Sequence, residues 1–166
     1  MTPALAPTAA PRRRAPYENW RPPIVGVSVL VPVGAHELAL VRVPGGALVL
    51  PTGAFEQEQS SEEAAQAVFT GLPVRRRVAV EQVQMRRRTV ITHLVVTDSL
   101  TRGVAEVLAY RDPRAEVHIL PTVQAVAALP QRARSRALLG LQALAIGAMV
   151  YIRDGEVQRL ESVPPL

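Results

Sequence analysis

Several kinds of residue are missing from this chain, and each absence removes a class of function. The sequence has no cysteine, which excludes disulfides, zinc–thiolate sites, iron–sulfur clusters and thiol nucleophiles. All 19 basic residues are arginine, so no Schiff base, phosphate-loop lysine or lysine general base can take part in a reaction. Aromatic residues make up only 4% of the chain, which argues against a stacking platform for single-stranded nucleic acid.

Long apolar runs are missing as well. The longest uncharged segment near the C-terminus, Ala137 to Ile152, has 16 residues and two glycines, whereas a membrane-spanning helix needs about 20 apolar residues. The N-terminal segment lacks the positive charge and the unbroken apolar stretch of a secretory signal. The sequence therefore predicts no membrane association and fits a cytoplasmic protein.

What the chain does contain is a large apolar fraction and an excess of positive charge. Of its 166 residues, 48% are hydrophobic, which fits one domain with its own core. The net charge of +5 favours an anionic partner, either a nucleotide-like small molecule or an acidic protein surface. Because a bias toward arginine alone produces such a charge, nucleic acid is not the expected partner. The sequence is compatible with a homo-oligomer.

Three segments differ in their residue patterns. Residues 1–22 are rich in proline, alanine and arginine without apolar periodicity, which predicts a flexible, disordered arm. Residues 23–148 alternate between β-branched runs and helical patterns, as expected of an α/β domain. Residues 149–166 contain a strand, an Asp154-Gly155 turn and a second strand, a strong signal for a C-terminal β-hairpin.

The central segment begins with strands and ends with helices. Strands are predicted over 24–33, 36–43 and 47–51, with Pro51 ending the third. Further patterns predict strands over 74–85 and 86–97, a weaker strand around 104–110, and helices over 120–129 and 131–149, which Pro130 separates.

The segment Leu50 to Pro73, "LPTGAFEQEQSSEEAAQAVFTGLP", has the appearance of an active-site signature. A helix is predicted from Ser60, which has capping-box spacing to Glu63, to a stop at Gly71. The order strand, glycine turn, strand, "LPTG", acidic loop, short helix and "TGL" resembles the Nudix family. The family's box is a glycine, five residues, a glutamate, seven residues, then Arg-Glu-hydrophobic-any-Glu-Glu-any-Gly-hydrophobic. With the strand, proline bend and helix downstream, the resemblance covers about residues 24–145.

The resemblance implies an α/β/α sandwich with a mixed β-sheet, to which the arm and the C-terminal hairpin are added. In the family, the box carboxylates share one helical face and hold magnesium or manganese, which neutralises a pyrophosphate while water attacks phosphorus. If Gly53 is the box glycine, the charged positions fall on Gln59, Ala67, Val68, Gly71 and Leu72. If Gly71 is its last glycine, they fall on Ala64, Ala65, Val68 and Phe69. The helix is thus predicted to be shorter than the family's by about 4.5 Å.

Both alignments therefore predict no metal site and no firm catalytic residue. Glu56 and Glu58, in the loop beside the expected cleft, remain weak catalytic candidates. The acids that follow, Glu62 and Glu63, are interpreted as helix-start residues. The three histidines are interpreted as isolated packed or surface residues.

The expected ligand-binding residues are Gly53 and three arginines. Arg42 ends the second strand, where members of the family that the chain resembles often carry an arginine near the substrate. Arg86 and Arg88 would share one face of a strand by alternation, and guanidinium groups suit phosphate or carboxylate.

The leading hypothesis is a Nudix-like protein with a degenerate box that does not catalyse, needs no cofactor, and binds a nucleotide-like ligand or a protein as a regulatory module. One alternative is a diverged pyrophosphohydrolase of nucleoside diphosphate conjugates, with magnesium or manganese held by Glu56, Glu58 or an acid such as Glu81, Asp98 or Glu106. A second alternative is an assembly protein that works through its arm and C-terminal hairpin.

Overall fold

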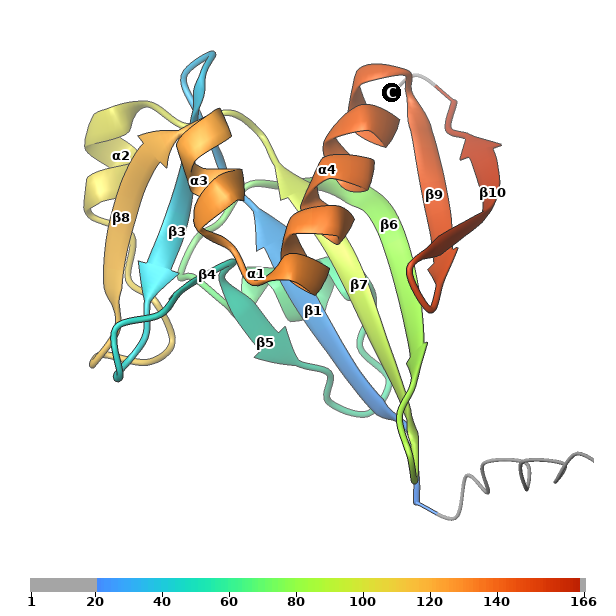
Figure 1. Cartoon of the computed structure of the whole chain (residues 1–166). Coiled ribbons are helices and arrows are strands. Elements are labelled where there is room, and N and C mark those ends of the chain that lie inside the picture. Colours follow the sequence, from blue (N-terminus) through green and yellow to red (C-terminus); the bar gives the residue numbers. More distant parts are fainter. Residues whose placement is uncertain (1–20, 165–166) are drawn as a thin grey trace, which may run out of the picture.

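Two β-sheets form the centre of the structure, a computed structural model that describes residues 21–164 (Figure 1). The predicted arm lies outside these residues except for its last two positions. The larger sheet has the strand order β10-β9-β6-β7-β1-β5. It is mixed, because β1 pairs with β7 and β6 with β9 in parallel, while its other pairs are antiparallel. Its strands are β1 (Ile24–Leu30), β5 (Thr52–Ala54), β6 (Val74–Gln84), β7 (Thr89–Thr97), β9 (Ala148–Arg153) and β10 (Glu156–Ser162).

The smaller sheet is built around β3 (Glu37–Arg42). This strand pairs in antiparallel fashion with β2 (Pro32–Val33), β4 (Leu48–Val49) and β8 (Glu116–Pro121).

The strand predicted over 47–51 is wrong in one respect, because the chain changes sheets at this point. Its first part, β4, pairs with β3, and after Pro51 the chain joins β1 as β5. Proline has no N–H for a ladder, and the Pro51 carbonyl accepts the Val29 N–H at 2.9 Å.

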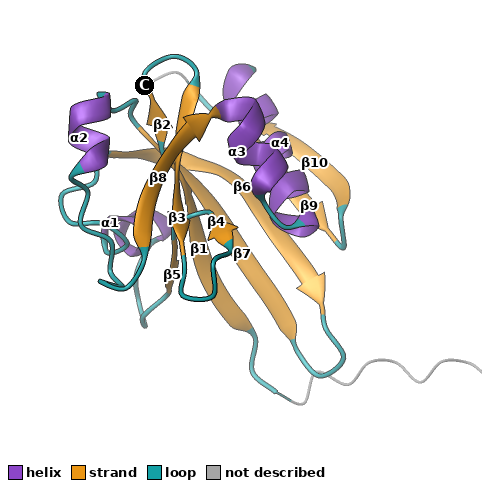
Figure 2. Cartoon of the chain, turned by 60° about the vertical axis from the view of Figure 1, so that its left-hand side comes forward, coloured by secondary structure: helices purple, strands orange, loops and turns teal. Residues whose placement is uncertain are grey.

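Helices cover both sides of the larger sheet (Figures 1 and 2). The short helix α1 (Ser61–Gln66) lies on one side, and α4 (Gln131–Ala145) lies on the other beside α3 (Thr122–Ala128). Helices are present in the three predicted segments, but α1 ends at Gln66 and not at the predicted stop at Gly71, and α4 ends at Ala145 and not at residue 149. The C-terminal hairpin is confirmed, and it extends the larger sheet through β9. None of the helices within residues 21–164 has both the length and the apolar character needed to cross a membrane.

The strand predicted around 104–110 is wrong, because the chain forms α2 (Arg102–Glu106) there. The Thr101 hydroxyl accepts the Val104 N–H and caps this single turn. The turn buries Ala105 completely while Val104 stays half exposed. A local cap and one small buried residue therefore outweigh the β preference of the valines.

The core is divided between the two sides of the larger sheet. Alternation along β7 places Leu94 and Val96 in a cluster with α4, and Val95 in a cluster with α1. Gly140 allows α4 to approach the sheet closely, since a Cβ at this position would overlap the Leu94 side chain. The two sides of the sheet are called the α1 side and the α4 side below.

Candidate functional site

Gly53, the expected box glycine, is a packing position in the structure. It lies in β5 opposite Val27 of β1. A Cβ added to Gly53 would lie 3.0 Å from Cγ2 of Val68, a residue just beyond α1. The absence of a side chain therefore lets the chain after α1 close onto the sheet.

The start of α1 has the predicted capping box. The Ser60 hydroxyl accepts the Glu63 N–H at 3.1 Å, and the Ser60 N–H donates to Glu63 Oε2 at 2.8 Å. Glu62 accepts a hydrogen bond from the Ser61 hydroxyl at 2.8 Å. Both acids thus have the helix-start positions expected of them, where negative charge suits the helix dipole.

The positions that the alignment on Gly71 assigns to the charged residues of the box are buried and apolar in the structure. Ala64, Ala65, Val68 and Phe69 are each at most 1% exposed. The Phe69 ring packs 5.3 Å from the Tyr110 ring, and the Tyr110 hydroxyl donates to the Thr52 carbonyl at 3.2 Å. This part of the segment therefore forms core on the α1 side and presents no oxygen ligand.

The weak catalytic candidates point to no common centre. Glu56 and Glu58 are exposed in a turn, where the Glu56 N–H donates to the Gln59 side chain at 3.0 Å and Glu58 has a φ of 67°. Asp98 is exposed, and Glu106 pairs with Arg102. Within residues 21–164, no three histidine or acidic side chains are grouped so that they could hold a metal ion. The donor set does not fit the magnesium or manganese that the resemblance implies.

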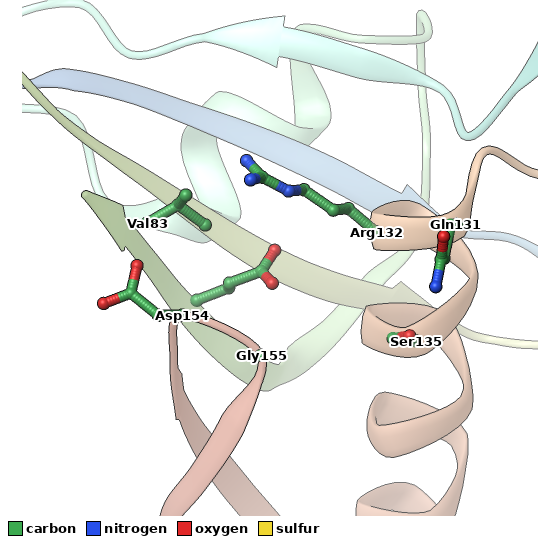
Figure 3. Close-up of a pocket in the computed structure, with 7 residues that line it drawn as sticks. Val83, Gln131, Arg132, Ser135, Asp154 and Gly155 are labelled. Atoms are coloured by element: carbon green, nitrogen blue, oxygen red, sulfur yellow. The ribbon is translucent and has the colours of Figure 1, made fainter. Parts of the chain in front are cut away.

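The remaining acid of the hydrolase alternative, Glu81, is buried on the α4 side. Its carboxylate accepts a hydrogen bond from Arg136 of α4. It borders a cavity of about 360 Å³ between β6, the start of α4 and the β9–β10 turn, in which Figure 3 shows Arg132 extending toward the sheet and Asp154 on the turn. Glu81 therefore lies on the opposite side of the sheet from α1.

The predicted ligand-binding arginines lie in two other places. Arg42 ends β3 as expected, donating to His118 Nε2 at 3.3 Å and to the Gly46 carbonyl at 2.9 Å. The prediction that Arg86 and Arg88 share a strand face is wrong. They lie in the β6–β7 turn, which the Met85 N–H closes on the Arg88 carbonyl at 2.9 Å.

The α1 side has a polar cluster around His93 that the sequence did not predict. The Phe55 and His93 ring centroids are 4.9 Å apart, and the Arg77 guanidinium donates to His93 Nδ1 at 3.1 Å. Burial, and then the charge of Arg77, lowers the pKa of His93, while the nearby Glu62 carboxylate partly offsets them. His93 is therefore a packed residue, as the sequence indicated, and its contact with Arg77 is one that the sequence did not indicate.

A β-bulge explains why this cluster was missed. The β6–β7 pairing places Val80 opposite His93, so regular alternation would put Arg77 on the other face. An irregularity between Arg77 and Ala79 instead pairs Arg77 with Val95, whose side chain packs on the α1 side. The extra residue reverses the face of Arg77, an effect that a bulge has by geometry.

A row of side chains extends this cluster across the sheet beyond α1. His93, Val80, Tyr151 and Arg159 are successive cross-strand partners on β7, β6, β9 and β10. The Arg159 guanidinium lies 3.9 Å from the centroid of the Tyr151 ring, within cation–π range. Val80 and Tyr151 also border a shallow cavity of about 260 Å³. We call Arg77, His93, Val80, Tyr151 and Arg159 the His93 surface.

The His93 surface combines cationic, aromatic and apolar groups. Arg77 contacts the neutral acceptor His93 Nδ1 and the sulfur of Met149, not a carboxylate. Arg159 lies 3.8 Å from Glu161, and both side chains are more than half exposed, so this ion pair is weak. The surface can therefore receive an anion that also has an apolar or aromatic part.

No protein-family model matches the sequence, and a comparison with curated proteins gives no match either. Solved structures do match. A MutT protein from Methanosarcina mazei Go1 has a TM-score of 0.55 at 13% identity, covering 76% of this chain and 96% of that one. A NUDIX hydrolase from Nitrosomonas europaea has a TM-score of 0.57 at 12% identity, covering 81% and 80%. A UDP-X diphosphatase has a TM-score of 0.52 at 17% identity, covering 82% and 70%. The chain therefore has the Nudix-like α/β/α fold.

Proposed function

We propose that the protein is a Nudix-fold binding module with a degenerate box, which binds an anionic, nucleotide-like ligand without metal-dependent hydrolysis. The single observation that carries this proposal is the burial of Ala65, Val68 and Phe69, to which the alignment on Gly71 assigns the glutamates of the box. A metal ion that bridges phosphates needs several oxygen ligands about 2.0–2.6 Å away. Side chains packed in a core cannot supply them.

The His93 surface is the proposed ligand site. It lies beside α1 on the same side of the sheet, and Arg77 offers a half-buried guanidinium whose partners are neutral. A guanidinium can neutralise phosphate charge without a metal. The ring of Tyr151 and the side chain of Val80 offer contact area for a base or another flat group.

Hydrolysis and binding can be measured separately. Purified protein is incubated with magnesium and ADP-ribose or UDP-glucose, and phosphate products are quantified. We expect no turnover above a buffer control. Magnesium-dependent turnover that Glu56→Gln or Glu58→Gln abolishes would reject the proposal in favour of the diverged hydrolase.

Binding is measured by calorimetry with the same two compounds in EDTA. We expect Arg77→Gln to weaken binding by about tenfold or more, because a hydrogen bond to a charged group contributes about 1.5–3 kcal/mol. Arg114→Gln is the matched control, since it removes the same charge from an exposed residue paired with Asp112. Equal affinities for the two variants would exclude the His93 surface as the site.

A further inference from the structure

A separate cavity of about 530 Å³ lies where β6 begins, α4 ends and β10 ends. The end of α4 forms one wall, so the cavity is distinct from the His93 surface, which is beside α1. Arg75 and Arg76 are its only charged lining residues among those the structure describes. The other lining residues are Leu144, Ala145, Ile146, Gly147, Ser162, Val163 and Pro164.

Neither arginine is paired with a carboxylate of residues 21–164. Arg76 donates to two backbone carbonyls, those of Ala148 at 2.8 Å and Arg77 at 3.2 Å. The Arg75 side chain has no hydrogen bond or ion pair with any residue in the range 21–164. Burial, and then the charge of Arg75, lowers the pKa of Arg76. Two like charges therefore line one cavity, and no acidic side chain among the described residues lines it with them.

Two features decide what the cavity would accept. The end of α4 contributes about half an elementary negative charge, so the two arginines still leave a net charge of about +1.5 at the cavity. Ile146 is 67% exposed at the cavity, and Ser162 adds a hydroxyl group. The surroundings thus suit an oxyanion attached to a body that is partly apolar.

We propose that Arg75 and Arg76 form an oxyanion site that takes the phosphate or carboxylate group of a small organic ligand. Adjacent guanidinium groups provide several N–H donors in the planar arrangement that such groups accept. The cavity is larger than a single phosphate ion, so the rest of the ligand would lie against Ile146 and Val163. The site does not depend on the function proposed for the His93 surface.

The test is an NMR titration of the arginine Nε–H signals with inorganic phosphate, and separately with acetate, at an ionic strength held constant with sodium chloride. We expect saturable shifts for Arg75 and Arg76, and the stronger of the two anions identifies the oxyanion class. Arg75→Gln should weaken binding about tenfold or more, the loss expected for a charge-assisted hydrogen bond, whereas Arg114→Gln should leave it unchanged. Equal weakening in both variants, or shifts that never saturate, would overturn the proposal.

Arg75→Glu provides a second test, because it should increase stability while it abolishes anion binding. Glutamate at this position would face Arg76, so it should replace a like-charge contact by an ion pair and raise the urea midpoint of the free protein. The same substitution should abolish the phosphate-dependent shifts of Arg76. A lower midpoint together with unchanged phosphate binding would also overturn the proposal. The Arg75 side chain has no hydrogen bond or ion pair in the described part of the chain, so its substitution removes no such interaction from the fold.

Discussion

Acidic side chains differ in exposure between the two sides of the larger sheet. On the α1 side, the acid-rich segment exposes Glu56 and Glu58 and buries Val68 and Phe69. On the α4 side, a carboxylate outside any recognisable motif, that of Glu81, is only 4% exposed. An acid-rich segment in the sequence therefore does not show where a buried carboxylate will lie. Glu81 is buried because Arg136, a residue distant in the sequence, pairs with it in the folded chain.

The largest effect should come from breaking the buried pair on the α4 side. We expect Glu81→Ala or Arg136→Ala to lower the free energy of unfolding by about 3–5 kcal/mol, because either change leaves one buried charge without its partner. The cost for Glu81→Ala is increased by Arg136 Nε, a buried donor that already has no acceptor within the described residues. Urea unfolding measures both variants.

The double variant Glu81→Leu with Arg136→Met is the control for this pair. It removes both charges and keeps apolar volume, so it should be near neutral or stabilising. If the single variants cost as little as exposed pairs do, under about 1 kcal/mol, the contrast between the two sides of the sheet would be lost.

The next effect tests the packing of Gly53 against Val68 on the α1 side. Gly53→Ala would stabilise through the unfolded chain by about 0.4–1 kcal/mol, but its Cβ would press on Val68 Cγ2, and overpacking costs about 1–3 kcal/mol. We expect a net loss of about 1 kcal/mol by urea unfolding.

Val68→Ala should make room for the new methyl group. Alone it should cost about 2 kcal/mol, through two lost methyl groups and a cavity. Combined with Gly53→Ala it should cost less than the sum by about 0.5 kcal/mol or more. Strict additivity would mean that Gly53 and Val68 are not in the contact that the structure gives them.

Local patterns predicted much of the fold. The alternating and helical runs gave β6, β7 and the C-terminal helices, and the Ser60 and Glu63 spacing predicted a cap that is present. The Asp154-Gly155 turn has positive φ at both positions, 49° and 88°, as a two-residue hairpin turn requires. Each of these features depends on residues that are close together in the sequence, so a local sequence pattern is enough to predict it.

The candidate site was less predictable because it depends on irregularities and on distant partners. The bulge after Arg77 places the Arg77 side chain on the face of the sheet opposite to the one that regular alternation predicts. The sequence pattern of the strand gives no sign of this bulge. Pairing of Glu81 with Arg136 joins residues 55 positions apart. The prediction for Arg86 and Arg88 was wrong because the strands predicted over 74–85 and 86–97 follow each other directly. They left no residues for the turn that connects β6 to β7.

A smaller effect distinguishes how the two flanking helices begin. We expect Ser60→Ala to cost about 1 kcal/mol, because it removes the acceptor for the Glu63 N–H at the start of α1. By contrast, α4 starts at Pro130 without a side-chain cap. Thr101→Ala is a matched control at α2, where the equivalent hydrogen bond is longer, 3.4 Å, and it should cost less. An equal or larger loss at Thr101 would show that cap geometry does not determine the effect.

The smallest effect is a pH dependence confined to the α1 side. Burial and Arg77 lower the pKa of His93 below the value of 6.5, so the unfolded chain binds the proton more tightly than the folded one. The contribution of His93 to stability is therefore complete above pH 6.5, and it decreases as the pH falls toward the folded pKa. Urea midpoints between pH 7.5 and 5 should show this decrease, and His93→Gln should reduce it.

Glu62→Gln should lower the His93 pKa further in an NMR titration, because the Glu62 carboxylate raises it. A folded pKa at or above 6.5 would instead mean that His93 is stabilised as a cation, and the His93 surface would then gain a positive charge at neutral pH.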